Sequence, residues 1–262
     1  MKLAAFTQID EMERYKRQLM LAGFNSDHQE RLGRSTALIA GIGGLGGTAA
    51  LYLAAAGIGR LVLVHRGDLT LSNLNRQILM REDWIGRPRV IMAQKRIQEI
   101  NSEVVVEIHD KLFSEDTAPA FIRDADIALS ARPNFRERRL LNAACVGKGI
   151  PMVEAAMNGM EAYLFNIIPG ATPCLHCVFP VDNPEWQELG FPVLGAVSGT
   201  LGCLMAVEAI KILTGFGKPL TSGMLTFNLM DMHFTTLNIH RDEQCPVCSP
   251  HAASAPRALS CS

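Results

Sequence analysis

A glycine-rich turn near residue 40 constrains the fold more than any other feature of the sequence. The segment Gly41–Gly46 reads GIGGLG, follows a short apolar run and precedes a longer helical pattern. Its first glycine permits a tight turn, the second lets backbone N–H groups approach a phosphate, and the third lets strand and helix pack closely. The helix N-terminus adds a partial positive charge. A merely tight turn does not need so many glycines, so we predict a nucleotide site. The residues expected to contact the nucleotide are Gly41, Gly43, Gly44, Leu45 and Gly46.

The pattern that follows Thr36 is typical of a parallel sheet. Short β-branched runs alternate with longer helical patterns, as in βαβ units. We therefore predict the α/β class, with a Rossmann-like, mainly parallel sheet and helices on both faces. The predicted strands are Ala37–Ala40, Arg60–His65, Val104–His109, Asp126–Ser130 and Pro151–Glu154. The predicted helices are Gly44–Ala56, Arg87–Asn101, Asp116–Arg123 and Asn134–Gly147.

Segments on either side extend this core. Asp10–Leu21 has the pattern of an amphipathic helix. Tyr163–Ile168 and Gly223–Leu237 have the pattern of antiparallel strands, and they lie on either side of a long apolar helix, Ala196–Leu213. The predicted parts are an N-terminal helical arm (1–34), a nucleotide-binding core (35–155), a C-terminal strand–helix–strand part (156–248) and a disordered tail (249–262) rich in Ala, Ser and Pro.

The charge balance argues against proteins that bind through a strongly basic surface. The 262 residues include 25 basic and 26 acidic ones, so nothing predicts binding to nucleic acid or to an anionic membrane. The N-terminus has too few consecutive apolar residues for a secretory signal. The apolar segment Ala196–Leu213 carries Glu208 and Lys211, as a packed helix would, so no transmembrane segment is expected. We expect a cytoplasmic protein.

Two CxxC pairs predict a metal site in the C-terminal part. Cys174 and Cys177 form the first pair, and Cys245 and Cys248 form the second. Four thiolates at this spacing make a closed tetrahedral zinc site, which leaves no ligand position for water and is therefore structural. Disulfides and a single redox CxxC remain the alternatives.

The end of the second predicted strand lacks a residue that dinucleotide folds normally have. An Asp or Glu there holds ribose hydroxyls, but this chain has His65, followed by Arg66. A neutral histidine can accept one hydrogen bond, and an arginine can hold a phosphate. An NADP-dependent reductase therefore remains a competing class.

Several motifs together resemble the ThiF/MoeB/HesA family, within the ubiquitin-activating-enzyme-like superfamily. The resemblance extends from about Asp10 to Cys248 and is specific in the order and spacing of its motifs. Two further segments, Met152–Tyr163 and Leu194–Leu201, are most similar to the HesA branch, found with nitrogen-fixation genes. The motifs that carry the resemblance are Arg14–Gln18, the glycine turn, Leu71–Gln77, Gly86–Arg89 and the two CxxC pairs.

The resemblance implies ATP chemistry. In such proteins ATP and Mg²⁺ react with the C-terminal carboxylate of a ubiquitin-fold sulfur carrier of the ThiS or MoaD type, which gives an acyl-adenylate and pyrophosphate. The resemblance also implies that Asn73 and Arg76 contact the phosphates. Arg17 is implied to reach the phosphates of the partner subunit's site in a homodimer. Arg17 and Arg76 are thus the catalytic cations that the resemblance implies, since guanidinium groups stabilise developing pyrophosphate charge well.

Three positions depart from the family pattern. Arg89 stands where relatives have a lysine, and His65 stands where they have the ribose acid. Pro133 replaces an aspartate that helps to hold magnesium, so we expect Asp68 or another acid to take its role. Asn134 and Glu137 have the spacing of a helix capping pair. Four arginines near it predict either an oxyanion pocket or a solvated basic turn: Arg132, Arg136, Arg138 and Arg139.

The function hypothesis that follows is a HesA-like accessory protein that binds and hydrolyses ATP. By resemblance it assists assembly of the nitrogenase iron–molybdenum cofactor by handling molybdenum or sulfur, and its partners are nitrogenase cofactor-assembly proteins. The alternatives are an adenylyltransferase that activates a ThiS- or MoaD-like carrier, an NADP-dependent reductase, and a nucleotide-gated scaffold without turnover.

Overall fold

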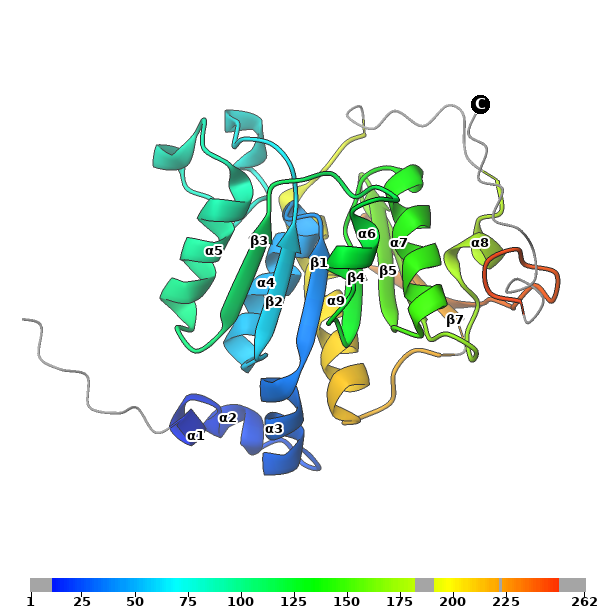
Figure 1. The fold of residues 1–262 in the computed structure, drawn as a ribbon, viewed down its shortest axis with the longest axis horizontal. Helices are drawn as coiled ribbons and strands as arrows, with labels where there is room; N and C mark the ends of the chain where they lie inside the picture. The colour runs from blue at the N-terminus through cyan, green and yellow to red at the C-terminus, as the bar shows by residue number, and fades with distance from the viewer. Residues whose placement is uncertain (1–10, 182–190, 222, 250–262) are drawn as a thin grey trace, which may run out of the picture.

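The chain folds around a single eight-stranded sheet. The computed structural model describes residues 11–181, 191–221 and 223–249. The strand order is β3-β2-β1-β4-β5-β6-β7-β8. Strands β1 to β5 are parallel, and β6 to β8 extend the sheet as antiparallel neighbours (Figure 1). The strands are β1 (Thr36–Ala40), β2 (Arg60–Val64), β3 (Val105–His109), β4 (Ile127–Ser130), β5 (Met152–Asn158), β6 (Glu161–Ile167), β7 (Gly223–Asn228) and β8 (His233–Asn238).

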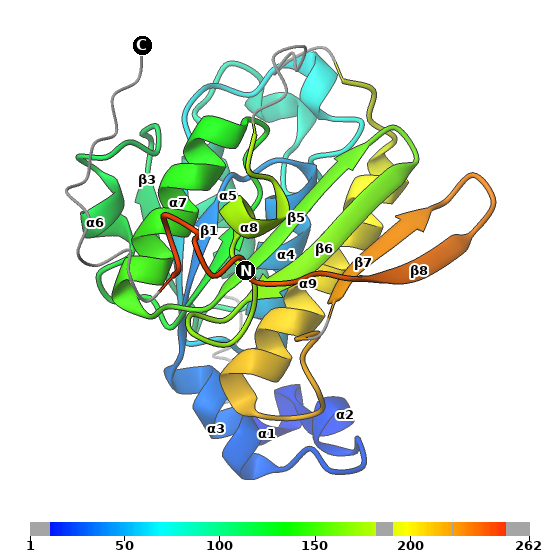
Figure 2. The same ribbon diagram turned by 90° about the vertical axis from the view of Figure 1, so that its right-hand side faces the viewer.

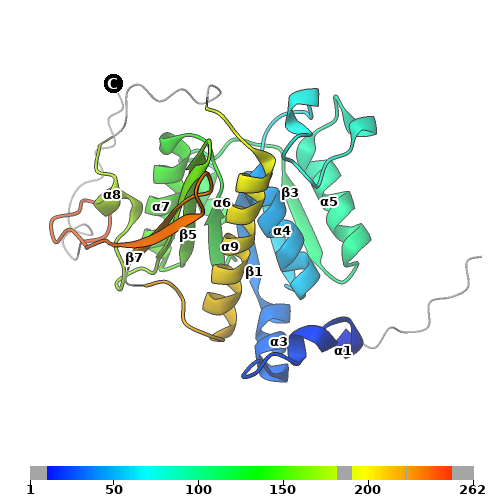
Figure 3. The ribbon, with the colours of Figure 1, turned by 180° about the vertical axis from the view of Figure 1, so that it is seen from behind.

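Helices cover both faces of the parallel half of the sheet. One apolar cluster joins α4, α5 and α9 to one face, and a second joins α6 and α7 to the other. Figure 3 shows α4 and α9 side by side over the first face. This arrangement confirms the predicted fold class. The helices are α1 (Glu11–Arg14), α2 (Lys16–Leu19), α3 (Ser26–Arg34), α4 (Gly44–Ala56), α5 (Arg89–Ile100), α6 (Ala118–Phe121), α7 (Phe135–Lys148), α8 (Leu175–Val178) and α9 (Gly195–Thr214), with 3-10 turns η1 (Leu71–Asn73) and η2 (Glu82–Trp84).

The turn between β1 and α4 has the conformation that its glycines predict. Gly41 has a φ of +104°, which L side chains rarely adopt, and a Cβ there would meet the carbonyl oxygen of Ala131 at 2.5 Å. Gly46 packs so closely on Gly41 that a Cβ would collide with the carbonyl oxygen of Gly41. Strand and helix therefore approach each other more closely than any other residue would allow.

Helix α9 is the long apolar helix that the sequence predicts. Among the described residues it alone is long and apolar enough to cross a membrane by length and composition. It packs on α4 and β5 in the core, and Glu208 forms an ion pair with Lys211 on it. Gly202 permits the close approach to α4, because a Cβ there would lie 2.6 Å from the Leu45 carbonyl oxygen and 2.7 Å from Thr48 Cβ.

Some boundaries differ from the predicted ones. The single helix expected over Asp10–Leu21 is two short helices, α1 and α2, and Asp10 itself lies outside the described residues. Between them, Tyr15 accepts a hydrogen bond from Asn101 Nδ2 at 3.0 Å, a contact between residues far apart in the sequence. The predicted tail lies outside the described residues, except for Ser249.

The antiparallel part is also more elaborate than predicted. The segment expected as one strand over Gly223–Leu237 is a hairpin, which turns at Met232 with a φ of 58° and projects from the body in Figure 2. The predicted strand Pro151–Glu154 continues as β5 to Asn158 and pairs with β6.

Glycines on α9 offer a matched test of the α4–α9 packing. Gly202→Ala should lower the free energy of unfolding by about 1–3 kcal/mol, because the added methyl group overpacks the helix contact. Gly199→Ala on the same helix has nothing within 4 Å of its Cβ, so it should be neutral or stabilising by up to about 1 kcal/mol through helix propensity. Urea unfolding of both variants measures the difference. Equal effects would contradict the packing described for α9.

Candidate nucleotide and metal sites

The candidate nucleotide site lies at the carboxyl ends of the parallel strands. The glycine turn leaves β1 there, and backbone N–H groups at the start of α4 point outwards because a helix leaves its first N–H groups unpaired. His65 follows β2, and the segment 131–134 follows β4, the parallel neighbour of β1. Open α/β folds bind their ligands at this edge.

His65 is tied directly to the glycine turn. Its Nδ1 accepts a hydrogen bond from the backbone N–H of Ile42 at 3.2 Å and lies 3.2 Å from Nη1 of Arg132. Burial lowers the pKa of His65 well below its usual value, and the charges of Arg89 and Arg132 lower it further. The lowered pKa and the two donors at Nδ1 favour a neutral imidazole at His65.

Three arginines converge on this edge. Burial lowers the pKa of Arg89, and the neighbouring charges of Arg132 and Arg76 add to that effect. The side chain of Arg132 also lies against Gly41, since a Cβ on Gly41 would be 3.2 Å from Arg132 Cδ. Like charges repel one another, so Arg76 and Arg89 favour a bound anion, whereas Arg132 is paired with Glu137.

The loop after β2 holds two of the predicted phosphate contacts. Asn73 accepts a hydrogen bond from the Thr70 N–H at 3.0 Å and caps the 3-10 turn. Arg76 donates to the carbonyl of Ser72 at 2.7 Å and to Asn75 Oδ1 at 2.9 Å. Both side chains are thus held by their own loop, and the charge of Arg76 acts on Arg89 across the site.

Of the other predicted residues, Arg89 and Asp68 lie at this edge of the sheet, and Arg17 does not. Arg89 donates to the carbonyls of Gly67 at 3.1 Å and Arg66 at 3.2 Å, which places it beside His65. Asp68 is exposed, and its charge acts on Arg89. Arg17 lies on α2, in the helical arm below the amino-terminal ends of the strands in Figure 1. Arg17 is exposed, and α2 lies at the end of the sheet opposite the start of α4 in Figure 1.

The turn after β4 has no carboxylate at Pro133, but the residues that follow it form hydrogen bonds and an ion pair. Asn134 caps α7 by accepting a hydrogen bond from the Glu137 N–H at 2.8 Å, as its spacing predicts. The Glu137 carboxylate forms a buried ion pair with Arg132 and accepts from the Phe113 N–H at 3.3 Å. Glu137 is therefore already engaged in neutralising Arg132.

Sequence reasoning missed a second buried ion pair on α7. Arg138 donates to both Glu154 on β5 and the hydroxyl of Tyr163 on β6. Burial alone would lower the pKa of Arg138, but the charges of Glu154 and Tyr163 and the hydrogen bonds to them together outweigh burial and raise the pKa. Arg132 and Arg138 are thus not part of an open oxyanion pocket or of a solvated turn, since both have buried carboxylate partners, whereas Arg136 is exposed. These groups come from α7, β5 and β6, so they meet only in the folded chain.

The four predicted zinc ligands lie together. All four Sγ atoms are within 4.8 Å of one another, and three of the separations are 3.9, 3.6 and 3.4 Å. A tetrahedral site with Zn–S bonds of about 2.3 Å places its sulfurs roughly 3.8 Å apart, so the donor set fits zinc. The contributing residues are Cys174, Cys177, Cys245 and Cys248.

Two sulfurs of the cysteine cluster accept hydrogen bonds from backbone N–H groups. Backbone N–H groups of Asp242 and Val247 each approach a sulfur at 3.5 Å. The cluster packs on α7, where Asn142 Oδ1 accepts a hydrogen bond from the Leu175 N–H at 3.0 Å. A metal here would therefore fix the C-terminal loop against the core.

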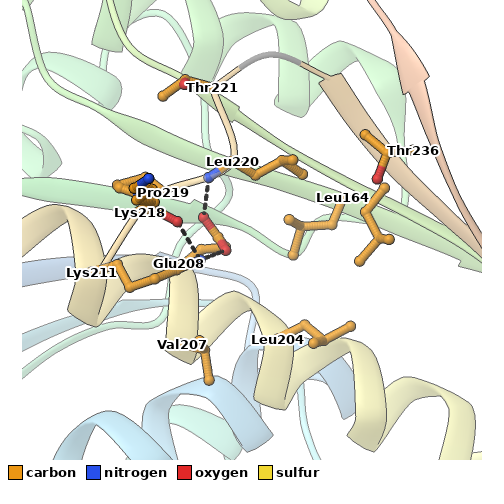
Figure 4. A pocket seen from close by; sticks show the side chains of 11 residues that line it. Leu164, Leu204, Val207, Glu208, Lys211, Lys218, Pro219, Leu220, Thr221 and Thr236 are labelled. Atoms are coloured by element: carbon orange, nitrogen blue, oxygen red, sulfur yellow. Dashed lines mark hydrogen bonds and ion pairs between the residues drawn. The ribbon is translucent and has the colours of Figure 1, made fainter. Parts of the chain in front are cut away.

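A separate cavity of about 260 Å³ lies between α9 and the antiparallel strands. Leu164, Leu204 and Val207 give it apolar walls, and the Glu208–Lys211 pair lies at its edge (Figure 4). No residue predicted for the nucleotide or metal site lines it.

The fold and these two sites define a Rossmann-type protein with a phosphate-binding turn and a tetracysteine cluster. A model of the ThiF family matches residues 15–247. The chain therefore belongs to the ThiF family. It is 55% identical to the vegetative HesA protein of Trichormus variabilis, over 94% of this chain and 92% of that protein. It is 36% identical to a sulfur carrier protein adenylyltransferase of Thermus thermophilus, over 91% of each chain.

The solved structures agree on the fold. The crystal structure of E. coli MccB with ATP superposes with a TM-score of 0.80 at 24% identity, over 90% of this chain and 74% of that one. At this identity the likeness concerns the fold alone. The predicted family is confirmed by the family model and by the relatives.

The cysteine cluster gives a direct prediction. The purified chain should contain about one zinc per molecule, and Cys245→Ser should lose it, because a fully buried ligand is removed. Cys203→Ser, at a half-buried cysteine outside the cluster, should keep the metal. Metal analysis and thermal unfolding with and without a chelator measure both effects. Full zinc content in Cys245→Ser would count against the site.

Proposed function

We propose that this chain binds ATP on the glycine turn and acts as a HesA-like, ATP-dependent accessory protein. The observation that carries the proposal is that Arg76 and Arg89 lie at the carboxyl edge of the sheet, held by backbone carbonyl groups that leave their charge uncancelled. This positive charge lies beside the N-terminus of α4, where a triphosphate gains from both the helix and the guanidinium groups. The similarity to HesA proteins over nearly the whole chain supports this choice among ATP-using functions.

The role in assembly of the nitrogenase iron–molybdenum cofactor is the finer part of this proposal. It rests on the 55% identity to HesA proteins and on the family resemblance. In this role ATP hydrolysis accompanies the handling of molybdenum or sulfur by nitrogenase cofactor-assembly proteins. The two observations about the site, its positive charge and its missing acid, are compatible with ATP use without acyl transfer.

Adenylyl transfer to a sulfur carrier is the second candidate. The Thermus thermophilus relative is an adenylyltransferase of this kind by name. Pro133 is the observation against efficient transfer, because it lacks the carboxylate that the family uses near magnesium. Asp68 is an exposed acid beside Arg89. If Asp68 bound Mg²⁺, phosphate oxygens and water molecules would supply most of the other ligands of the ion.

Restoring the missing acid separates these two candidates. Wild-type protein with ATP, Mg²⁺ and a purified ThiS- or MoaD-like carrier should show little ATP–pyrophosphate exchange. Pro133→Asp should raise carrier-dependent exchange about tenfold or more, because the new carboxylate stabilises the metal at the transferring phosphate. Pro133→Asn, which introduces the neutral isostere of aspartate, is the control and should not raise the exchange.

Rapid exchange by the wild-type protein that depends on the carrier's terminal glycine would contradict the favoured role. Asp68→Asn would then show whether Asp68 supplies the missing function.

Tight NADPH binding that ATP does not displace would instead favour the reductase. ATP binding without any turnover would favour the scaffold.

A homodimer belongs to the same proposal. Helix α2, which carries Arg17, lies in Figure 1 at the end of the sheet opposite the start of α4, so Arg17 contacts a nucleotide only if another subunit brings one. The outer face of α4 and α9 is apolar and exposed, with Tyr52 and Val207 each 51% exposed and Tyr52 in contact with Cys203. A second copy covering this face would bury these side chains.

Charge substitutions on two exposed valines test the dimer. The wild-type chain should sediment at about twice its mass of 28.6 kDa. Val207→Asp should shift it to the monomer, because a carboxylate cannot be buried without a partner. Val105→Asp, on the edge strand β3 and 60% exposed, should leave the dimer intact. A wild-type monomer at micromolar concentration would rule out this interface and the role of Arg17.

A further inference from the structure

The two ring nitrogens of His65 have different surroundings. Nδ1 lies 3.2 Å from the Ile42 N–H and 3.2 Å from Nη1 of Arg132, and both of these groups are donors. A guanidinium does not lose its proton in proteins. Nδ1 must therefore present a lone pair, and the proton of the neutral ring is on Nε2. Burial and the charges of Arg89 and Arg132 keep the ring neutral by lowering its pKa.

The Nε2–H group is buried and has no hydrogen-bond partner among the described residues. The His65 residue is only 9% exposed, so bulk water does not satisfy this donor. Buried donors in proteins nearly always have a partner. The partner is therefore expected to be a group that enters the site when a ligand binds.

The place of His65 in the fold indicates which group that is. His65 directly follows β2 and contacts the first peptide N–H after Gly41. In Rossmann folds the residue at this position binds the ribose, and it is normally an Asp or Glu that accepts hydrogen bonds from sugar hydroxyls. Here the position offers a single neutral donor. The residues beside it, Arg66 and Arg89, also offer only donors from their side chains.

We infer that His65 binds the ribose of the nucleotide as a hydrogen-bond donor, so that the site selects only weakly for sugar hydroxyl groups. This inference rests on the proposed binding of ATP at the glycine turn. A carboxylate gains two charge-assisted bonds from the 2′- and 3′-hydroxyls, and it loses one of them with each deoxy sugar. A neutral Nε2–H gives one ordinary bond to either oxygen, so loss of one hydroxyl costs little.

Binding of ATP, 2′-deoxyATP and 3′-deoxyATP to the full chain tests the inference. The wild-type dissociation constants for the three nucleotides should agree within about threefold, as for an ordinary neutral hydrogen bond. His65→Asp should bind ATP at least about tenfold more tightly than either deoxy nucleotide, because it restores the charged acceptor. His65→Asn is the neutral control and should show no such preference. Thermal unfolding establishes that each variant is folded.

The possible failures are distinguishable. If no nucleotide binds, the proposed ATP site is wrong and the inference falls with it. If ATP binds but the wild-type protein rejects a deoxy nucleotide by more than about tenfold, or if His65→Asp shows no ribose preference, only the inference is overturned.

Nitrogen NMR of the wild-type protein gives a test that does not depend on a variant. The His65 ring should show an unprotonated Nδ1 and a protonated Nε2, and the Nε2–H resonance should shift when ATP is added. A proton on Nδ1, or an Nε2–H resonance that ATP leaves unchanged, would overturn the inference.

Discussion

The close approach of α4 to β1 is the constraint on which the rest of the structure depends. It exists because Gly41 and Gly46 remove the side chains that would separate the strand from the helix. It aims the first N–H groups of α4 at the carboxyl edge of the sheet. Helix α9 packs on α4 and on β5, so the same apolar cluster holds the turn and the antiparallel extension. The proposed nucleotide site thus lies directly on the packed core.

The charges around this turn have two different roles. Arg132 and Arg138 are neutralised by the buried partners Glu137 and Glu154, which tie α7 to the end of β4 and to β5. Arg76 and Arg89 are held by carbonyl groups of the protein. Backbone carbonyls fix a guanidinium without cancelling its charge, so positive charge remains available to a phosphate. This division explains why a chain with a net charge of −1 can offer a basic site.

Local patterns made the glycine turn and the cysteine pairs predictable from sequence. The six residues Gly41–Gly46 determine their own backbone path, and each CxxC pair brings two ligands together within one short turn. Contacts between distant residues were not predictable. Tyr15 contacts Asn101, and Arg138 on α7 pairs with Glu154 on β5. The hairpin at Met232 had no glycine to mark it.

For the site residues too, the sequence predicted positions but not the contacts between distant residues. Sequence placed His65 at the ribose position, but only the contacts of its Nδ1 with Ile42 and Arg132 establish which nitrogen carries the proton. Sequence likewise placed Pro133 where the family has an acid, but it did not show that Glu137 is engaged by Arg132. The identity of the replacement acid therefore stays a proposal about Asp68.

A crystal structure of the chain with a non-hydrolysable ATP analogue tests the central claim most directly. The account predicts phosphate oxygens within hydrogen-bond distance of backbone N–H groups between Gly41 and Gly46, with Arg76 and Arg89 turned towards them. An analogue bound elsewhere, or a turn that makes no contact with phosphate at saturating ligand, would contradict it.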